Sequence, residues 1–387
     1  MASERKLPAK EDRCGKSSET VDYPFLFLTL LLLVVGLVML YSASYAQSEY
    51  DTGYTVSTKY LQKQAVCAVI GLIAMYFFSR IPVGFWYRLA WPLYGLSIVL
   101  LLSVLLIGQE VNGAKRWINI AGIQFQPSEV AKFTMIVLFA RLTRHFGQRA
   151  AQFRYGVMGF GMALMGILVP LALEKHLSAI MLMGMVAVVM MFVAGTHPKW
   201  LLAGAAAAGL FVVIYIRFMG YAGDRVTAWL HPELDPGDTG YQILQSLYAI
   251  GSGGLFGLGL GKSRQKYLYL PFQYNGYIFA IICEELGFLG ALLIIALFIA
   301  LILRGFWIAL NAPDRFSTVL AAGLTTLIAV QTVLNLCVVT NLLPSTGIAL
   351  PFFSYGGTAL AVNLGEMGIL LGISRMRDRA SKMEDVL

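Results

Sequence analysis

The chain has 387 residues, of which 58% are hydrophobic and only 13% are charged. Soluble globular domains carry about 25% charged residues, so this composition excludes an ordinary soluble enzyme. Apolar residues are spread along the whole chain, which also excludes a soluble protein with a single membrane anchor. The formal net charge of +8 is typical of cationic cytoplasmic loops in a membrane protein, and we expect no nucleic-acid partner.

The apolar runs predict an all-α polytopic membrane protein, because a crossing needs about 20 apolar residues and the chain holds about ten such runs. The expected spans are 24–45, 61–79, 85–107, 127–143, 156–173, 178–195, 199–218, 277–303, 316–339 and 356–374. The polar residues 1–22 predict a disordered cytoplasmic tail, residues 23–375 one transmembrane domain, and residues 376–387 a second cytoplasmic tail.

Basic residues predict the orientation of these spans. An even number of crossings places both termini on one side, and most Lys and Arg residues then fall in cytoplasmic segments, as the positive-inside rule requires. The extracytoplasmic face carries three long loops, at 108–126, 219–276 and 340–355. Loops of this length are usually functional or disordered, and apolar residues at helical spacing in 219–276 predict short helices at the membrane surface.

Two opposite charges lie inside the fourth expected span. Glu129 and Lys132 stand three residues apart, which places them on one face of a helix. Charges inside a membrane are costly and are functional candidates by default. One interpretation is a buried ion pair that orients the helix. The other is a polar site facing a cavity, where the carboxylate holds a proton or a metal and the ammonium group binds phosphate.

Cations on the outer loops indicate an anionic partner. Lys115 and Arg116 oppose the positive-inside bias, and they suit a lipid pyrophosphate or lipid headgroups. The glycine-rich segment 249–263 lacks the spacing of a phosphate-binding P-loop, so we expect its glycines to allow close packing against helices. Lys262 and Lys266 follow this segment and could face headgroups or a sugar phosphate.

Three further carboxylates, Glu284, Glu285 and Glu366, lie in expected spans and could face a cavity or the interface. The segment 342–358 is rich in Gly and Pro. Irregular backbone is stable at membrane depth only when it is buried in protein or lines a water-filled cavity, so we expect a re-entrant element next to the site. His176 has no second metal ligand at a suitable spacing, which favours a structural role. From the residues alone, two classes stay open: a transporter or flippase, and an enzyme of the outer leaflet.

Four stretches together resemble the SEDS family (the shape, elongation, division and sporulation proteins), and they are most similar to its FtsW/SpoVE branch. They are Gly113–Lys132, Gly240–Lys266, Tyr277–Gly287 and Asn341–Thr358. The resemblance implies about ten transmembrane helices and a glycosyltransferase that polymerises lipid II at the outer face of the bacterial cytoplasmic membrane. It also implies a role in cell division or sporulation, with a class B penicillin-binding protein and other division or sporulation proteins as partners.

The resemblance implies inverting chemistry, in which the 4-hydroxyl of an acceptor sugar displaces undecaprenyl pyrophosphate from the anomeric carbon. Such a reaction needs a general base and cations or a metal on the developing charge. We expect no tightly bound cofactor, and a requirement for Mg²⁺ or Mn²⁺ stays open.

The resemblance places Arg116, Glu129 and Lys132 in the cavity by motif, and the other site residues are expected from their charge, polarity and place in the chain. The expected catalytic positions are Glu129, Lys132 and 276. The expected substrate-binding residues are Lys115, Arg116, Trp117, Gln126, Ser128, Arg225, Gln242, Gln245, Ser246, Lys262, Lys266, Ser354 and Tyr355.

The chain departs from the family pattern at two places. The family reads Leu-Pro-Glu-x-x-Thr-Asp where this chain has Phe272 at the Glu position and Gly276 at the Asp position. At 174–178 it reads Glu-Lys-His-Leu-Ser, where the family tends to show Pro-Asp-x-Gly. Another carboxylate could substitute, or the chain could act as a scaffold or activator of the penicillin-binding protein, or as a lipid II flippase. The candidate substitutes are Asp224, Glu233, Asp235, Asp238, Glu129 and Glu284.

Overall fold

The computed structural model describes residues 21–111, 114–120, 123–204, 206, 227–234 and 239–384. Most of these residues are helical, which confirms the predicted all-α membrane class. The helices are α1 (Tyr23–Asp51), α2 (Lys59–Phe78), α3 (Val83–Ile107), α4 (Pro127–Phe146), α5 (Phe160–Leu173), α6 (Leu177–Val193), α9 (Thr239–Ser252), α10 (Ile278–Leu310), α11 (Arg315–Val339) and α12 (Gly357–Glu384), with short helices at Gly147–Ala151, Arg154–Gly159 and Pro232–Leu234.

Seven of the described helices are long and apolar enough to cross a membrane. They are α1, α2, α3, α10, α11, the segment Arg154–Leu173 that includes α5, and Gly357–Met376 of α12. Helix α6 is a shorter apolar helix. The chain is therefore a multi-pass membrane protein. Residues 207–218 of the seventh expected span lie outside the described residues, as do residues 1–20 of the first tail, and the total of about ten crossings stays a prediction.

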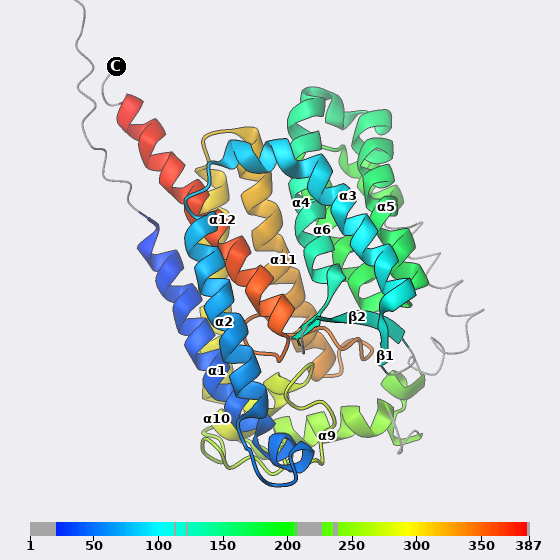
Figure 1. Ribbon diagram of the computed structural model, residues 1–387, viewed down its shortest axis with the longest axis vertical. Coiled ribbons are helices and arrows are strands. Elements are labelled where there is room, and N and C mark those ends of the chain that lie inside the picture. Colours follow the sequence, from blue (N-terminus) through cyan, green and yellow to red (C-terminus); the bar gives the residue numbers. More distant parts are fainter. Residues whose placement is uncertain are drawn as a thin grey trace, which may run out of the picture.

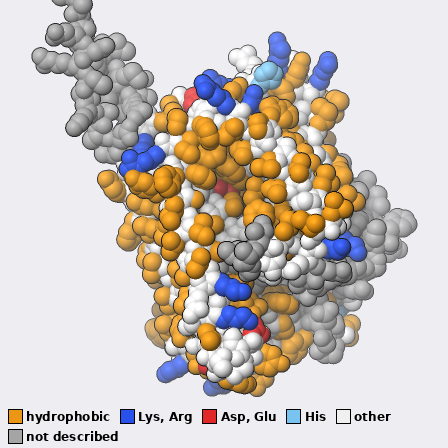
Figure 2. All heavy atoms as spheres, in the orientation of Figure 1, with side chains coloured by type: hydrophobic (Ala, Val, Ile, Leu, Met, Phe, Trp, Pro, Cys, Tyr) orange, Lys and Arg blue, Asp and Glu red, His pale blue; other side chains and the backbone are white. Residues whose placement is uncertain are grey.

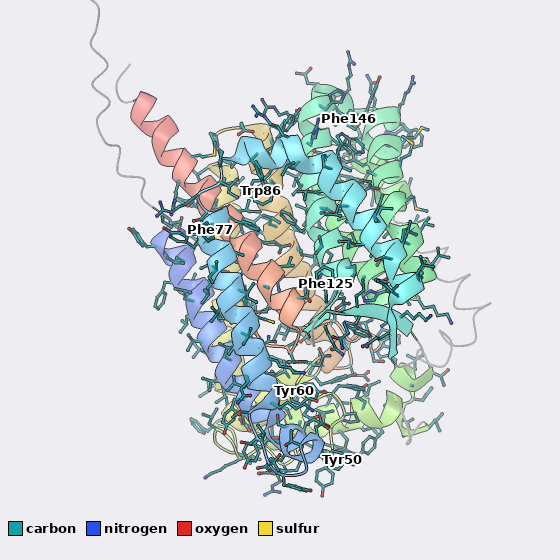
Figure 3. The ribbon with its side chains drawn as sticks, viewed as in Figure 1. Tyr50, Tyr60, Phe77, Trp86, Phe125 and Phe146 are labelled. Carbon is teal, nitrogen blue, oxygen red and sulfur yellow. The ribbon has the colours of Figure 1, made fainter. Side chains whose placement is uncertain are left out.

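The helices run up and down in one bundle, with two different ends (Figure 1). Helix α1 begins and α12 ends at the same end, which we call the tail end. The opposite end, the loop end, carries α9 and the loop after it (Figure 1). Hydrophobic side chains cover much of the flank between the two ends, and Lys and Arg side chains gather at the tail end (Figure 2). Figure 3 shows Trp86 towards the tail end and Tyr60 at the loop end.

Side-chain caps fix where two long helices begin. The carboxylate of Asp22 accepts the backbone N–H of Phe25 at 3.1 Å and pairs with Arg304 of α10 at 2.9 Å. Asp314 accepts the N–H groups of Phe316 and Ser317 at the start of α11. Such caps satisfy N–H groups that have no partner within the helix.

A small antiparallel sheet precedes α4 and was not predicted from the sequence. Its strands are β1 (Gln109–Val111), β2 (Ala114–Ile120) and β3 (Ile123–Phe125), in the order β1-β2-β3. Three residues per outer strand is too short for an alternating pattern to be recognised. The sheet is tied to α12, because Thr358 Oγ1 donates to Gln124 O at 2.9 Å.

The loop after α9 packs onto an interruption in α10. Gly287 has φ 69° and breaks the helix, so the carbonyls of Glu284 and Glu285 are free to accept hydrogen bonds from Leu258 and Gly259 at 2.9 and 3.0 Å. A Cβ atom on Gly257 would lie 2.1 Å from the Glu285 carbonyl oxygen. The predicted packing role of these glycines is confirmed, and so is a helix, α9, in the 219–276 loop.

Gly257→Ala is expected to lower the free energy of unfolding by about 2–5 kcal/mol, because it adds left-handed strain to a backbone clash. The matched control is Gly254→Ala in the same loop. Gly254 also has a positive φ, 55°, but a Cβ atom on it would meet no other atom within 4 Å. We expect the control to cost about 1–2 kcal/mol, from strain alone. Equal thermal unfolding midpoints for the two variants in detergent would contradict this packing.

The segment between α11 and α12 is irregular and buried, as expected for a re-entrant element. Phe352 and Phe353 are 2% and 0% exposed. Side-chain amides satisfy its backbone: Gln331 donates to Ala349 O at 3.0 Å, and Asn335 donates to Ile348 O at 2.7 Å. Gln64 of α2 bonds both Ser354 O and Gly356 N. Backbone without regular structure is therefore held inside protein rather than exposed to lipid.

Candidate active site

The first feature of the site is a buried ion pair at the first turns of α4. Lys132 Nζ lies 2.7 Å from Glu129 Oε2, and the two side chains are 4% and 10% exposed. Pro127 starts the helix and Glu129 lies in its first turn, which suits the positive end of the helix dipole. The predicted pairing on one helix face is confirmed, and the pair lies beside the sheet, because α4 begins directly after β3.

Glu366 of α12 joins this pair. Its side chain is 1% exposed, and neither carboxylate oxygen has a hydrogen-bond partner within the described ranges. It lies close enough to Lys132 and Glu129 for direct electrostatic interaction. One ammonium group thus pairs with Glu129 and acts electrostatically on Glu366, in a setting where an uncompensated charge is costly. The sequence left Glu366 unassigned, because nothing local connects it to α4.

The turn between α5 and α6 lies against the sheet and brings further buried polar residues to the site. Arg116 of β2 donates to Lys175 O at 2.6 Å, which holds the turn against the sheet. Glu174 and His176 are 3% and 9% exposed. Burial raises the pKa of Glu174 to about 8, against the opposing effect of Arg116. Burial, with the positive charges of Arg116 and Lys132, lowers the pKa of His176 to about 3. The imidazole is therefore neutral at physiological pH.

Position 276 lies next to the same turn. The Gly276 carbonyl accepts a hydrogen bond from Asn335 at 2.8 Å. A Cβ atom on Gly276 would meet only Gly347, at 3.4 Å, so a side chain fits there. Thr346, the residue before Gly347, accepts a hydrogen bond from the Ser178 hydroxyl. One short stretch, 346–347, thus touches position 276 on one side and the 174–178 turn on the other.

A family model described as a cell cycle protein, FtsW/RodA/SpoVE, matches residues 23–379. The chain belongs to the FtsW/RodA/SpoVE family. It is 40% identical to the probable peptidoglycan glycosyltransferase FtsW of Trichlorobacter lovleyi, over 90% of this chain and 92% of that protein. It is 39% identical to the stage V sporulation protein E of Bacillus subtilis, over 92% of this chain and 97% of that protein.

Solved structures show the same fold. A chain from a peptidoglycan synthase complex that coordinates polymerisation and crosslinking superposes with TM-score 0.79 at 28% identity, over 92% of this chain and 98% of that one. The rod shape determining protein RodA of Thermus thermophilus superposes with TM-score 0.70 at 27% identity, with the same coverage. The resemblance found in the sequence is confirmed.

Several expected substrate-binding residues of this FtsW/RodA/SpoVE chain lie near the Glu129–Lys132 ion pair at the start of α4. Ser128 is buried beside the ion pair, and Trp117 is half-buried on β2. Lys115 is exposed on the same strand. The backbone N–H of Gln126 donates to Thr358 Oγ1 at 3.3 Å, which joins the start of α4 to α12.

Other expected residues hold the loops together. Gln242 donates to Pro271 O at 3.1 Å, Ser246 to Val339 O at 2.8 Å, and Ser354 to Asn275 O at 2.6 Å. Tyr355 packs against Tyr60, with ring centroids 4.9 Å apart. Their substrate-binding role stays a prediction, as does that of the half-buried Gln245. Arg225 lies outside the described residues.

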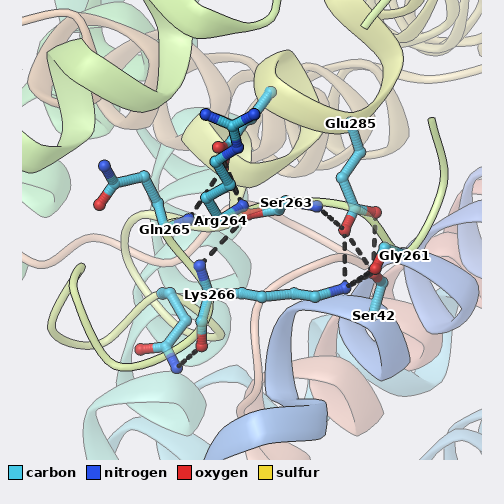
Figure 4. A network of polar contacts seen from close by, with 9 residues as sticks. Ser42, Gly261, Ser263, Arg264, Gln265, Lys266 and Glu285 are labelled. Carbon is cyan, nitrogen blue, oxygen red and sulfur yellow. Dashed lines mark hydrogen bonds and ion pairs between the residues drawn. The ribbon is translucent and has the colours of Figure 1, made fainter. Parts of the chain in front are cut away.

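A second buried network fixes the loop after α9 (Figure 4). Lys266 Nζ lies 3.0 Å from Glu285 Oε1 and also donates to Ser42 Oγ and Gly261 O. Glu284 accepts hydrogen bonds from the Ser263 hydroxyl and from two backbone N–H groups, at 264 and 265. These contacts bind the loop to α1 and α10. Lys262 instead points outward, beside an open hollow of about 710 Å³ that Arg264, Tyr267 and Tyr269 also line.

Proposed function

We propose that this chain is a peptidoglycan glycosyltransferase that polymerises lipid II. The observation that carries the proposal is the buried charged centre at the start of α4. Lys132 pairs there with Glu129 and lies within electrostatic range of Glu366, and Arg116 and Lys132 both act on His176. The names of the relatives favour a glycosyltransferase over a scaffold without catalysis or a flippase.

The two cations suit a pyrophosphate leaving group. Arg binds phosphate oxygens through paired hydrogen bonds and Lys acts as a point charge. In the proposed reaction the 4-hydroxyl oxygen of the acceptor attacks the anomeric carbon of the lipid-linked donor. The bond from that carbon to the pyrophosphate oxygen breaks, and its electron pair leaves with undecaprenyl pyrophosphate. Preorganised cations stabilise that developing charge in a site that excludes water.

The distribution of basic residues supports placing the centre on the extracytoplasmic face of the bacterial cytoplasmic membrane. At the tail end, Arg80 packs over Tyr76 at 4.7 Å and Arg304 over Trp307 at 3.8 Å. Arg141 and Arg144 pack over Tyr87. Lys and Arg residues gathered at one end are typical of the cytoplasmic side, whereas aromatic residues occur at both interfaces, and this leaves the loop end outside.

A class B penicillin-binding protein and other division or sporulation proteins are the proposed partners, because one solved relative comes from a peptidoglycan synthase complex. No tightly bound cofactor is proposed. A requirement for Mg²⁺ or Mn²⁺ stays a prediction. Among the residues that the structure describes, no group of three or more His, Cys, Asp or Glu side chains is placed to hold a metal ion.

The test is polymerisation of fluorescent lipid II by the purified chain together with its class B penicillin-binding protein, whose crosslinking site is blocked. Reactions run with Mg²⁺, with Mn²⁺ and with a chelator. We expect a ladder of glycan strands that a muramidase digests. A reaction without product, beside a related FtsW that polymerises under the same conditions, would contradict the proposed function.

A further inference from the structure

The attacking hydroxyl must lose a proton, and four described carboxylates around the site are engaged by other groups, exposed or protonated. The candidate substitutes Asp224, Asp235 and Asp238 lie outside the described residues. Gly276 has no side chain. Glu129 forms an ion pair with Lys132 at 2.7 Å. Glu284 accepts hydrogen bonds from a hydroxyl and two backbone N–H groups. Glu233 lies exposed on a short helix and pairs with His231. The burial that raises the pKa of Glu174 to about 8 keeps that carboxyl mostly protonated at neutral pH.

His176 has the properties that these carboxylates lack. Its ring is nine-tenths buried, and Nδ1 has no hydrogen-bond partner in the described part of the chain. It lies within electrostatic range of Arg116 and Lys132, the two cations proposed to hold the leaving group. A buried nitrogen without a partner normally costs free energy and indicates a functional reason or a bound molecule.

The turn that carries His176 is linked to position 276 through residues 346–347. Ser178, two residues further along the chain, donates to Thr346 O, and the next residue, Gly347, is the nearest neighbour of a Cβ atom on Gly276. A group reaching in from the 174–178 turn therefore approaches the region that a side chain at 276 would enter.

We propose that His176 is the general base of this chain, accepting the proton of the acceptor hydroxyl in place of a side chain at position 276. The inference rests on the proposed function. The hydroxyl oxygen forms its bond to the anomeric carbon, and its proton moves to an imidazole nitrogen. The electron pair of the broken bond leaves with the pyrophosphate, and the imidazolium then releases its proton to that anion or to water.

Donor binding controls the strength of this base. In the free protein burial disfavours a positive charge on His176, Arg116 and Lys132 disfavour it further, and the imidazole stays neutral. A pyrophosphate bound at the two cations offsets their part of the effect while burial remains, so the imidazolium is easier to form with the donor present than without it. The other charged groups described around this turn are Glu129 on α4 and the neighbouring residues Glu174 and Lys175.

The experiment compares lipid II polymerisation by the full chain with its partner in His176→Ala, His176→Gln, Gly276→Asp and the double variant His176→Ala/Gly276→Asp. General bases contribute about 100- to 10,000-fold, so we expect each single His176 variant to be at least about 100-fold slower. Imidazole added to His176→Ala, or the aspartate in the double variant, should restore activity. His197→Ala, an exposed histidine beyond the other end of α6, is the matched control and should retain wild-type activity.

Four results would overturn the inference. If His176→Ala and His176→Gln polymerise within twofold of wild type, His176 is not the base, and the polymerase function stands. If folded His176 variants are silent and neither imidazole nor Gly276→Asp restores them, the side chain has another role. If wild type is silent and Gly276→Asp alone is active, this chain lacks a working base. If wild type and all variants are silent, the proposed function itself fails. Thermal unfolding of every variant establishes folding.

Discussion

Replacing Lys132 by methionine is expected to lower the free energy of unfolding by about 3–5 kcal/mol, the cost of leaving a buried charge without its partner. Lys132 is the ammonium group that Glu129 contacts at 2.7 Å and that acts electrostatically on Glu366. Its removal leaves Glu129 buried without its cation, with a second buried carboxyl, Glu366, within electrostatic range. Thermal and denaturant unfolding of the purified protein in detergent measure the effect.

A double variant separates loss of charge balance from loss of packing. Glu129→Gln/Lys132→Gln removes both members of the pair, and replacing a buried pair with neutral groups is often close to neutral in stability. We expect it to recover most of the stability that Lys132→Met loses. Lys199→Met, at an exposed lysine, is the matched control for removing one positive charge. Equal losses in the single and double variants would show that the charge balance is unimportant.

Lys266→Met is expected to have an effect of similar size, again about 3–5 kcal/mol, because Glu285 then stays buried without a cation. The Lys266 and Glu285 side chains are 3% and 0% exposed, and their contact ties the loop after α9 to α10 and α1. We also expect faster proteolysis within residues 253–277. Unfolding midpoints and limited proteolysis measure the two effects.

Lys262→Met is the matched control for this network. Lys262 lies four residues earlier in the same loop, with its side chain exposed. Its replacement should change stability by no more than about 0.5 kcal/mol, as for most surface positions. If Lys262→Met and Lys266→Met unfold alike and are cut alike, the loop does not depend on the buried pair.

The sequence predicts the helices well because the hydrophobic pattern is local. Expected spans 61–79, 85–107 and 316–339 differ by at most two residues at each end from α2, α3 and α11. Where polar residues continue a helix, the span predicted from hydropathy ends before the helix does. Helix α1 extends to Asp51, and α12 extends to Glu384, within the expected tail. The interruption of α10 depends on the loop that packs into it, and no local pattern indicates it.

The site also contains features that the local sequence predicts and features that depend on packing. Glu129 and Lys132 could be paired from their spacing alone, because residues three apart on a helix are neighbours. Glu366 and His176 come from other elements, and only packing brings them to the pair. A single histidine without a second ligand favoured a structural role, and its Nδ1 without a partner becomes visible only in the folded chain. The loss of a side chain at Gly276 is visible in the sequence, whereas the groups around it are not.

The most direct test of a polymerase centred on the loop end of α4 compares initial rates of glycan formation. Wild type and the Glu129→Gln/Lys132→Gln variant are assayed with the same class B penicillin-binding protein and lipid II, at equal amounts of folded protein. The account predicts glycan strands from wild type and at least about 100-fold less from the double variant, because a cation on the developing pyrophosphate charge is lost. Equal rates from the two proteins would contradict it.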